Sequence, residues 1–161
     1  MSSKNYFDSV SDQWDTIRQT FFSDSIREKL CEAAQVKEGS TAVDIGAGTG
    51  FVTQELLNRK LRVIAIDQSK EMLNVLEQKF GSSGAITCIQ ADAYTLPLES
   101  ESVDYVMANM FLHHVENPGR AISEMARILK PGGKLVIADL DRHEYEFLRK
   151  EQFDVWLGFE R

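Results

Sequence analysis

The 161-residue chain is poor in cysteine, has no surplus of positive charge and contains no long apolar run. Its two cysteines, Cys31 and Cys88, stand far apart, which disfavours both a disulfide framework and a cysteine-ligated metal site. The formal net charge is −7, so we expect no nucleic-acid partner. No apolar stretch approaches the ~20 residues of a membrane span, and no apolar signal core follows the N-terminus. We therefore expect a cytoplasmic protein without a membrane span.

The most informative stretch is a glycine-rich segment, V-D-I-G-A-G-T-G, at residues 43–50. Before it, Thr41, Val43 and Ile45 alternate as in a β-strand, and after it residues 51–57 follow a helical pattern. Glycines let the backbone turn sharply and lie close to a ligand, and the start of the helix points unpaired N–H groups at the same place. The segment predicts a strand, a tight turn and a helix built around a bound molecule.

Two carboxylates narrow the class of that molecule. Asp67 ends a second apolar strand at 61–66, where an acid can accept hydrogen bonds from a ribose diol. Asp44 stands two residues before Gly46, where it would repel a pyrophosphate but suit a cationic amine and a sulfonium. The spacing G-x-G-x-G also differs from the G-x-G-x-x-G of dinucleotide binders. The pattern favours S-adenosylmethionine (SAM) and disfavours a nucleotide-binding oxidoreductase.

Strands and helices alternate along the chain, which predicts an α/β fold. Apolar strands are expected at 41–45, 61–66, 85–90, 102–109 and 134–140, helices at 50–59, 70–80 (capped by Ser69) and from Asn117–Pro118 onward, and a turn at 130–133. Almost continuously apolar strands indicate a Rossmann-like, doubly wound, mostly parallel sheet that is covered on both faces. Ligands bind such sheets at the carboxyl ends of the strands, where Asp44, Asp67, Asp92 and Asn109 stand.

In combination these motifs resemble those of class I SAM-dependent methyltransferases. The chain is most similar to the small-molecule branch of that family, the ubiquinone- and menaquinone-methylase-like or methyltransferase type 11-like proteins. The matching segments are the glycine motif at 43–50, the ribose acid Asp67, the adenine loop Gln90–Ala93, the run Asn109–Val115 after the fourth strand, and L-K-P-G-G at 129–133. The resemblance covers about residues 40–140.

The resemblance implies nine cofactor-binding residues, grouped by the part of SAM that each would contact. They are Asp44, Gly46, Ala47, Gly48 and Asn109 at the methionine end, Asp67 at the ribose hydroxyls, and Gln68, Asp92 and Ala93 at the adenine. The implied reaction is an in-line displacement that moves the methyl group to a small-molecule acceptor and leaves S-adenosylhomocysteine. The alternative is a SAM-binding module or subunit without independent catalysis.

Methyl transfer depends more on orientation than on acid–base groups. His113 and His114 are the candidate catalytic bases for an acceptor that is a poor nucleophile; alternatively they belong to a structural loop in which one ring bonds to the backbone. No metal site is expected. His143 with Asp139 and Asp141 offers suitable ligand atoms, but the two acids alternate across a strand and so do not face one ion.

The whole chain, 1–161, is expected to form one domain. It would consist of a helical arm at 1–38, a core at 39–141 and a C-terminal helix at 142–161. The arm could cover the cofactor as a lid or pack on the sheet. The family's sheet usually has seven strands, and the C-terminal strands are missing from this sequence, which would leave an unpaired apolar edge. We therefore expect either a truncated chain or a homo-oligomer that completes the sheet edge.

Overall fold

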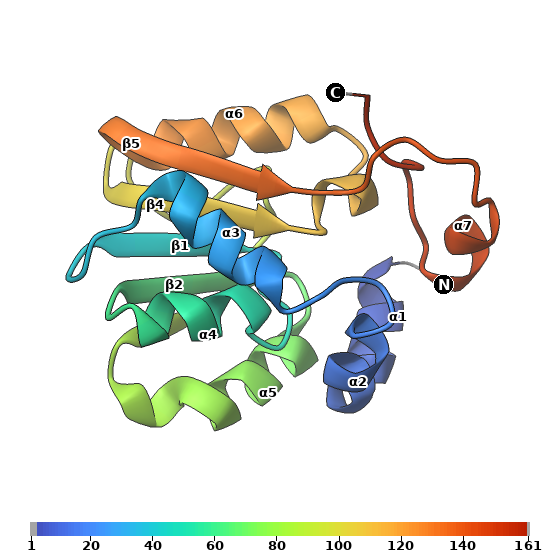
Figure 1. Ribbon diagram of the computed structural model, residues 1–161, viewed down its shortest axis with the longest axis horizontal. Helices are drawn as coiled ribbons and strands as arrows, with labels where there is room; N and C mark the ends of the chain where they lie inside the picture. The colour runs from blue at the N-terminus through green and yellow to red at the C-terminus, as the bar shows by residue number, and fades with distance from the viewer. Residues whose placement is uncertain (1–2, 161) are drawn as a thin grey trace.

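The computed structural model describes residues 3–160 and contains a five-stranded sheet, with its strands in the order β3-β2-β1-β4-β5 (Figure 1). Every neighbouring pair of strands is parallel. The strands are β1 Thr41–Ile45, β2 Arg62–Asp67, β3 Ile86–Gln90, β4 Val103–Asn109 and β5 Leu129–Ala138. The helices are α1 Ser3–Val10, α2 Trp14–Arg18, α3 Ser25–Ala34, α4 Phe51–Asn58, α5 Lys70–Phe80, α6 Pro118–Ile128 and α7 Phe147–Glu151, with 3-10 turns η1 Ser11–Gln13, η2 Gly81–Ser83 and η3 Leu112–His114. The predicted Rossmann-like α/β fold is confirmed.

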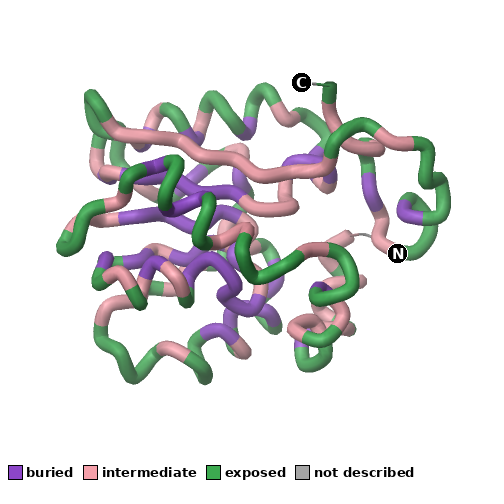
Figure 2. The backbone as a smooth tube through the Cα atoms, viewed as in Figure 1, coloured by how far each residue is buried: buried purple, intermediate pink, exposed green. Residues whose placement is uncertain are grey.

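Helices cover both faces of the sheet, because alternate residues of each strand point to opposite sides. On β4, Tyr105 and Met107 pack in a cluster with α3 and α4, whereas Val106 and Ala108 pack in a cluster with α6. All four side chains are buried, and the tube in Figure 2 is buried along the central strands. Burial on both faces is the physical reason why these strands are apolar at nearly every position.

Two predicted helix starts are confirmed by the hydrogen bonds that cap them. The Ser69 hydroxyl accepts the N–H of Met72 at 3.1 Å and starts α5. The Asn117 side chain accepts the N–H of Arg120 at 3.0 Å and starts α6, with proline at the first helical position. Within residues 3–160, none of the helices has both the length and the apolar character needed to cross a bilayer.

The turn predicted at 130–133 lies inside β5 as an irregularity of the ladder. Leu129 pairs with Val103, and the next pair is Lys134 with Tyr105, so β5 gains residues relative to β4 between them. The intervening residues bulge out of the ladder, which is why a turn signal and a continuous strand coexist at the same place.

The C-terminal helix predicted over 142–161 is wrong, because α7 is the only helix that the structure shows in 142–160. Phe153 has a φ of 60°, which a continuing helix does not allow. Beyond it, the N–H groups of Val155 and Trp156 donate to the carbonyl oxygen of His113 at 2.9 and 3.0 Å. These bonds replace helical ones, so the segment docks on η3 beside the carboxyl end of β4.

The N-terminal arm divides into two parts with different neighbours. In α3, Leu30, Cys31 and Ala34 are buried in a cluster with side chains of α4 and of the sheet, and the helix contacts β5, so it packs on the sheet. The helices α1 and α2 lie beyond the carboxyl ends of the strands, next to α5 (Figure 1). Packing on the sheet is therefore observed for α3, whereas a lid over the cofactor stays a prediction for α1 and α2.

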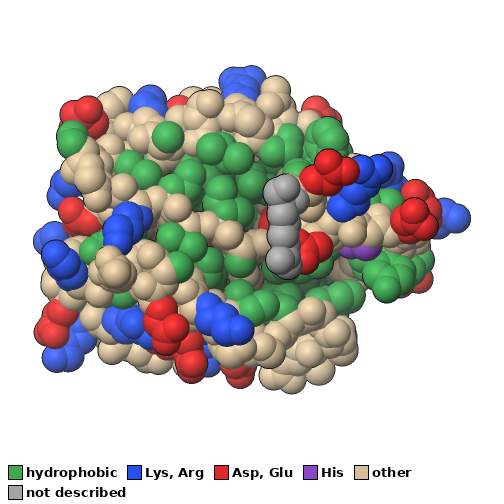
Figure 3. Space-filling view, turned by 45° about the horizontal axis from the view of Figure 1, so that its top comes forward, with side chains coloured by type: hydrophobic (Ala, Val, Ile, Leu, Met, Phe, Trp, Pro, Cys, Tyr) green, Lys and Arg blue, Asp and Glu red, His purple; other side chains and the backbone are tan. Residues whose placement is uncertain are grey.

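Strand β5 forms a free edge of the sheet, as expected. Within residues 3–160 it pairs with β4 alone. Its side chains Leu135, Val136 and Ile137 are half-buried. Figure 3 shows hydrophobic side chains gathered on the face of the molecule that includes this edge of the sheet. Completion of this edge by self-association stays a prediction.

Candidate functional site

A cleft opens at the carboxyl ends of β1, β2 and β4, where the sequence placed the cofactor. Its lining contains seven of the nine predicted cofactor-binding residues: Asp44, Gly46, Ala47, Gly48, Asp67, Gln68 and Asn109. One predicted catalytic residue, His114, lines the same cleft. The topology thus brings residues that are far apart in sequence to one edge, as expected for a parallel sheet.

Gly46 begins the sharp turn after β1. Its φ is +66°, and a Cβ atom placed on it would overlap the ring of Phe111, so only glycine fits this position. The N–H groups of Gly46 and Ala47 donate to the carbonyl oxygen of Ile66 at 2.9 and 3.1 Å. The glycine loop is therefore anchored to the end of β2, and its residues line the cleft.

Asp67, at the end of β2, is fixed by backbone donors. One carboxylate oxygen accepts the N–H of Gly48 at 2.9 Å, and the other accepts the N–H of Ser69 at 2.9 Å. Burial raises the pKa of Asp67, although these hydrogen bonds oppose the shift. The carboxylate thus connects the glycine loop to the start of α5 and lies in the cleft wall, where a diol could bind.

Asp44 is 1% exposed and lies beneath the glycine loop. Its carboxylate accepts the N–H of Thr53 at 3.0 Å and the hydroxyl of Thr53 at 2.7 Å. Burial raises the pKa of Asp44 to about 7 despite these bonds. The sequence analysis missed Thr53, although its place in the first turn of α4, after the glycines, was a usable signal.

Asn109, at the end of β4, has a buried side-chain oxygen without a hydrogen-bond partner. Such an atom costs free energy unless a donor reaches it, and the residue lines the cleft. An ammonium group between Asn109 and Asp44 would supply that donor. The residues of the cleft therefore fit a cofactor that carries an amino-acid end and a ribose, the two features of SAM.

The first part of the arm closes one side of the cleft with aromatic rings. Phe7 and Trp14 both line it, and their rings meet edge-to-face with centroids 5.1 Å apart. The arm is attached to the glycine loop by Asp15, which accepts the Thr49 hydroxyl at 2.8 Å and pairs with Lys79. Sequence reasoning proposed a lid here without identifying this attachment, which joins residues far apart in the chain.

Of the three residues predicted to contact adenine, only Gln68 lines the cleft. Its carbonyl oxygen accepts the side chain of Gln90 at 2.9 Å, which ties β2 to β3. Asp92 and Ala93 are not among the lining residues; Asp92 is exposed and accepts the N–H of Tyr94 at 2.8 Å, while Ala93 is buried in the core. Their contact with adenine stays a prediction.

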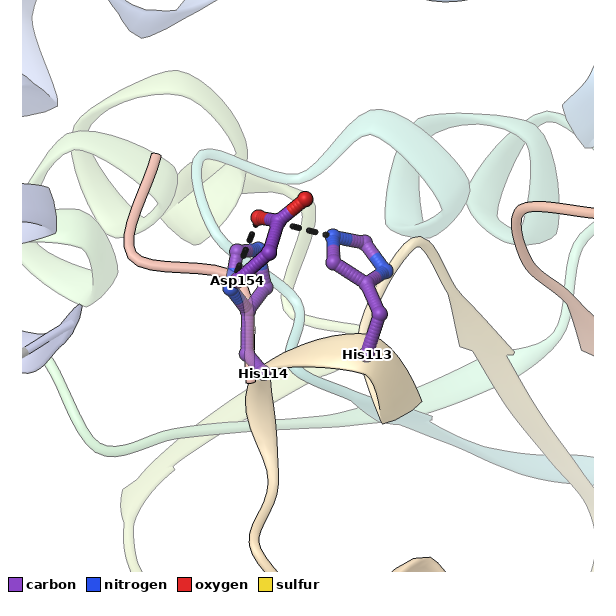
Figure 4. A group of neighbouring side chains, drawn as sticks. All are labelled: His113, His114 and Asp154. Atoms are coloured by element: carbon purple, nitrogen blue, oxygen red, sulfur yellow. Dashed lines mark ion pairs between the residues drawn. The ribbon is translucent and has the colours of Figure 1, made fainter. Parts of the chain in front are cut away.

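The predicted catalytic histidines lie side by side in η3, and both rings are near Asp154 (Figure 4). The ring of His113 is within 2.6 Å of Asp139 through Nδ1, whereas His114 lines the cleft. Burial, with the nearby His113, lowers the pKa of His114 to about 3, so this ring is neutral at pH 7. Burial opposes ionisation of Asp139, yet the hydrogen bond from His113 holds its pKa below the usual range.

Comparison with known proteins agrees with this site. A family described as "Methyltransferase domain" matches residues 43–137, more than half of the chain. A demethylmenaquinone methyltransferase of Thermobifida fusca is 30% identical over 158 residues, which is 95% of this chain and 65% of the relative. An uncharacterised methyltransferase of Schizosaccharomyces pombe is 38% identical over 113 residues, 70% of this chain and 43% of the relative. The chain thus spans less than two thirds of the length of these relatives.

Solved structures show the same architecture. A SAM-dependent methyltransferase of Aquifex aeolicus superimposes with a TM-score of 0.68 at 26% identity, over 82% of this chain and 75% of that one. A complex of the Trm112 methyltransferase activator of Haloferax volcanii with a methyltransferase matches with a TM-score of 0.80 at 26% identity, over 92% of this chain and 68% of that one. Together with the cleft geometry, these matches show that the chain belongs to the methyltransferase-domain family, whose cofactor is S-adenosylmethionine.

Proposed function

We propose that this chain transfers the methyl group of SAM to a small, planar, largely apolar acceptor that carries a hydroxyl group. The observation that carries the proposal is the composition of one cleft. Its lining holds the polar groups of Asp44 and Asp67, the unpartnered oxygen of Asn109, and the aromatic rings of Phe7 and Trp14. A lining that combines polar groups with aromatic rings suits a polar cofactor next to an apolar acceptor.

The polar residues would bind and orient the cofactor. Asp44 and Asn109 would accept hydrogen bonds from its ammonium group, and Asp67 from its ribose hydroxyls. When bound, SAM supplies an electrophilic methyl group, so the bond from the acceptor to carbon forms as the bond from carbon to sulfur breaks. The protein contributes mainly by holding the two reactants in line, which in model systems accounts for about 7–11 kcal/mol of the barrier.

His114 would act on the acceptor side of the cleft. A neutral imidazole with a pKa of about 3 is a weak base, but it can form a hydrogen bond with an acceptor hydroxyl and so orient it. An acceptor that ionises readily by itself, such as a reduced quinone, requires no stronger base. The name of the Thermobifida relative, demethylmenaquinone methyltransferase, supports this chemical class.

Calorimetric titration with S-adenosylhomocysteine tests the cofactor half of the proposal. We expect saturable one-site binding by the wild-type chain, weaker binding by Asp67→Ala, and unchanged binding by Asp12→Ala, an exposed carboxylate outside the cleft lining. The proposal would be overturned if the wild-type chain did not bind S-adenosylhomocysteine. It would also be overturned if the chain bound NADH but not S-adenosylhomocysteine.

Transfer of labelled methyl from SAM to reduced demethylmenaquinone, measured by product mass, tests the acceptor half. Binding of S-adenosylhomocysteine without transfer to any quinol would favour the second candidate, a SAM-binding subunit that needs a partner. The structural neighbour that is bound to a methyltransferase activator supports that candidate. Size-exclusion chromatography of the chain alone would show whether it self-associates, as predicted from the free edge of β5.

A further inference from the structure

We propose that His113, His114 and Asp154 form a binding site for a divalent transition-metal ion of the zinc class. The three side chains come from two segments, η3 and the segment after α7, and they point toward one another (Figure 4). Each offers one ligand atom, and these atoms all lie within 4.8 Å of one another. Within residues 3–160 this is the one group of histidine, cysteine and acidic residues with such an arrangement.

The distances agree with coordination of a single ion. Oδ1 of Asp154 lies 3.7 Å from Nε2 of His113 and 3.6 Å from Nδ1 of His114. Two ligand atoms that are each about 2.1 Å from a tetrahedral zinc ion stand about 3.4 Å apart. Small side-chain movements would therefore bring the three atoms to coordination distance.

Two of the three ligand atoms are buried without a hydrogen-bond partner. They are Nδ1 of His114 and Oδ1 of Asp154, and the Asp154 side chain is only 2% exposed. A carboxylate that is taken out of water without a hydrogen-bond donor for one oxygen is costly, and a bound cation removes that cost. The ion pair distances are too long for direct hydrogen bonds, so the three atoms leave a gap that a cation would bridge.

Asp139 orients His113 in the way that a metal ligand requires. Its carboxylate already accepts the N–H groups of Leu112 and Leu140, each at 2.8 Å, so it acts as an acceptor toward His113 as well. The proton between them, over 2.6 Å, is then on Nδ1 of His113. This tautomer leaves the lone pair of Nε2 facing Asp154, and a carboxylate behind a histidine is a common feature of zinc sites.

A second, smaller cavity adjoins the site. It is lined by all three proposed ligands together with apolar side chains, including Leu140 and Leu148. Two imidazoles and one carboxylate favour zinc and similar ions over magnesium or calcium, which prefer oxygen ligands only. Three protein ligands leave a position for a non-protein ligand, and the cavity gives it room.

Titration of the metal-free, full chain with ZnCl2, and separately with CoCl2, tests the proposal without reference to methyl transfer. We expect one equivalent of zinc per chain, and visible cobalt absorption bands that zinc displaces. Asp154→Asn and His114→Gln should each weaken zinc binding by at least about 100-fold, and Asp139→Asn by about 10–100-fold, the usual cost of losing a group behind a ligand.

Two matched variants control for charge and for histidine content. Glu151→Gln removes an exposed carboxylate three residues from Asp154, and His143→Gln removes the chain's third histidine; neither residue is in the group of three. Both should bind zinc as the wild type does. Circular dichroism must show that each variant is folded, and His114→Gln tests the site independently should Asp154→Asn unfold. No saturable zinc binding by the wild type, or equal loss in the control variants, would overturn the proposal.

Discussion

The two halves of the sheet's carboxyl edge hold their acidic residues in different ways. On the β1–β2 side, Asp44 and Asp67 accept hydrogen bonds mainly from backbone N–H groups that lie 2 to 19 residues away along the chain. On the β4–β5 side, Asp139 and Asp154 meet the rings of His113 and His114, up to 41 residues away. The first half is organised by a local motif, and the second by the way the chain folds back on itself.

This difference has a chemical consequence. Backbone donors are present as soon as the strand–turn–helix unit forms, so the first half is ready to receive an ammonium group and a diol. The second half keeps two ligand atoms without partners, and it requires another chemical species to satisfy them. Four predictions, from the largest expected effect to the smallest, test how separate the two halves are.

The largest effect is expected from Gly46→Ala in the first half. A positive φ costs an alanine roughly 1–2 kcal/mol, and overlap with the Phe111 ring adds roughly 1–3 kcal/mol, so we expect a loss of about 3 kcal/mol in the free energy of unfolding. Gly39→Ala is the control: its φ is +80° but no atom lies within 4 Å, so the conformational cost of roughly 1–2 kcal/mol remains alone. Urea unfolding measures both, and equal losses would refute a packing role for Gly46.

The next effect separates the halves directly. Asp67→Asn should weaken S-adenosylhomocysteine binding by about 10–150-fold, because hydrogen bonds to a charged group contribute about 1.5–3 kcal/mol. His113→Gln, whose ring faces Asp139 and not the cleft lining, should leave that affinity nearly unchanged. Calorimetric titration measures the affinity of each variant for S-adenosylhomocysteine. A comparable loss of affinity in His113→Gln would show that the two halves act as one site.

The third effect depends on pH. With a pKa of about 7, Asp44 is mostly ionised at pH 8 and mostly protonated at pH 6. If the carboxylate form binds the ammonium group, affinity for S-adenosylhomocysteine should fall about tenfold between pH 8 and pH 6, in proportion to the ionised fraction. The raised pKa also means that the folded state binds this proton more tightly than the unfolded state. The contribution of Asp44 to the free energy of unfolding therefore falls as the pH rises from 3.8, the pKa of an unperturbed aspartate, through 7. In Asp44→Asn the affinity should no longer change with pH.

The smallest effect concerns the arm. Asp15 joins α2 to the glycine loop through Thr49 and Lys79, but its side chain is 42% exposed. Exposed pairs contribute about 0–1 kcal/mol, so Asp15→Asn should lower stability by less than about 1 kcal/mol, and added salt should reduce the difference. Thermal unfolding at low and high salt measures this. Asp15→Ala also removes the acceptor for the Thr49 hydroxyl, so a larger loss in that variant that salt does not change would mean that this hydrogen bond, not the ion pair, holds the arm.

Most of the fold was predictable because its signals are local. The strands are buried on both faces, so their apolar runs stand out, and Ser69 and Asn117 mark helix starts by bonds to the next turn. The C-terminal helix over 142–161 was predicted from the resemblance to a family in which a helix follows the fifth strand, and here bonds from Val155 and Trp156 to His113 decide the conformation instead. A pattern within a segment contains no information about a carbonyl group more than 40 residues away.

The site divides in the same manner. The sequence alone determined the glycine loop, Asp44, Asp67 and the family, because a strand–turn–helix unit places these groups through nearest-neighbour geometry. Only the tertiary structure decided that Trp14 walls the cleft and that Asp154 meets His113 and His114. Those contacts depend on where distant segments dock, and docking is set by the summed burial of many side chains, which no short motif encodes.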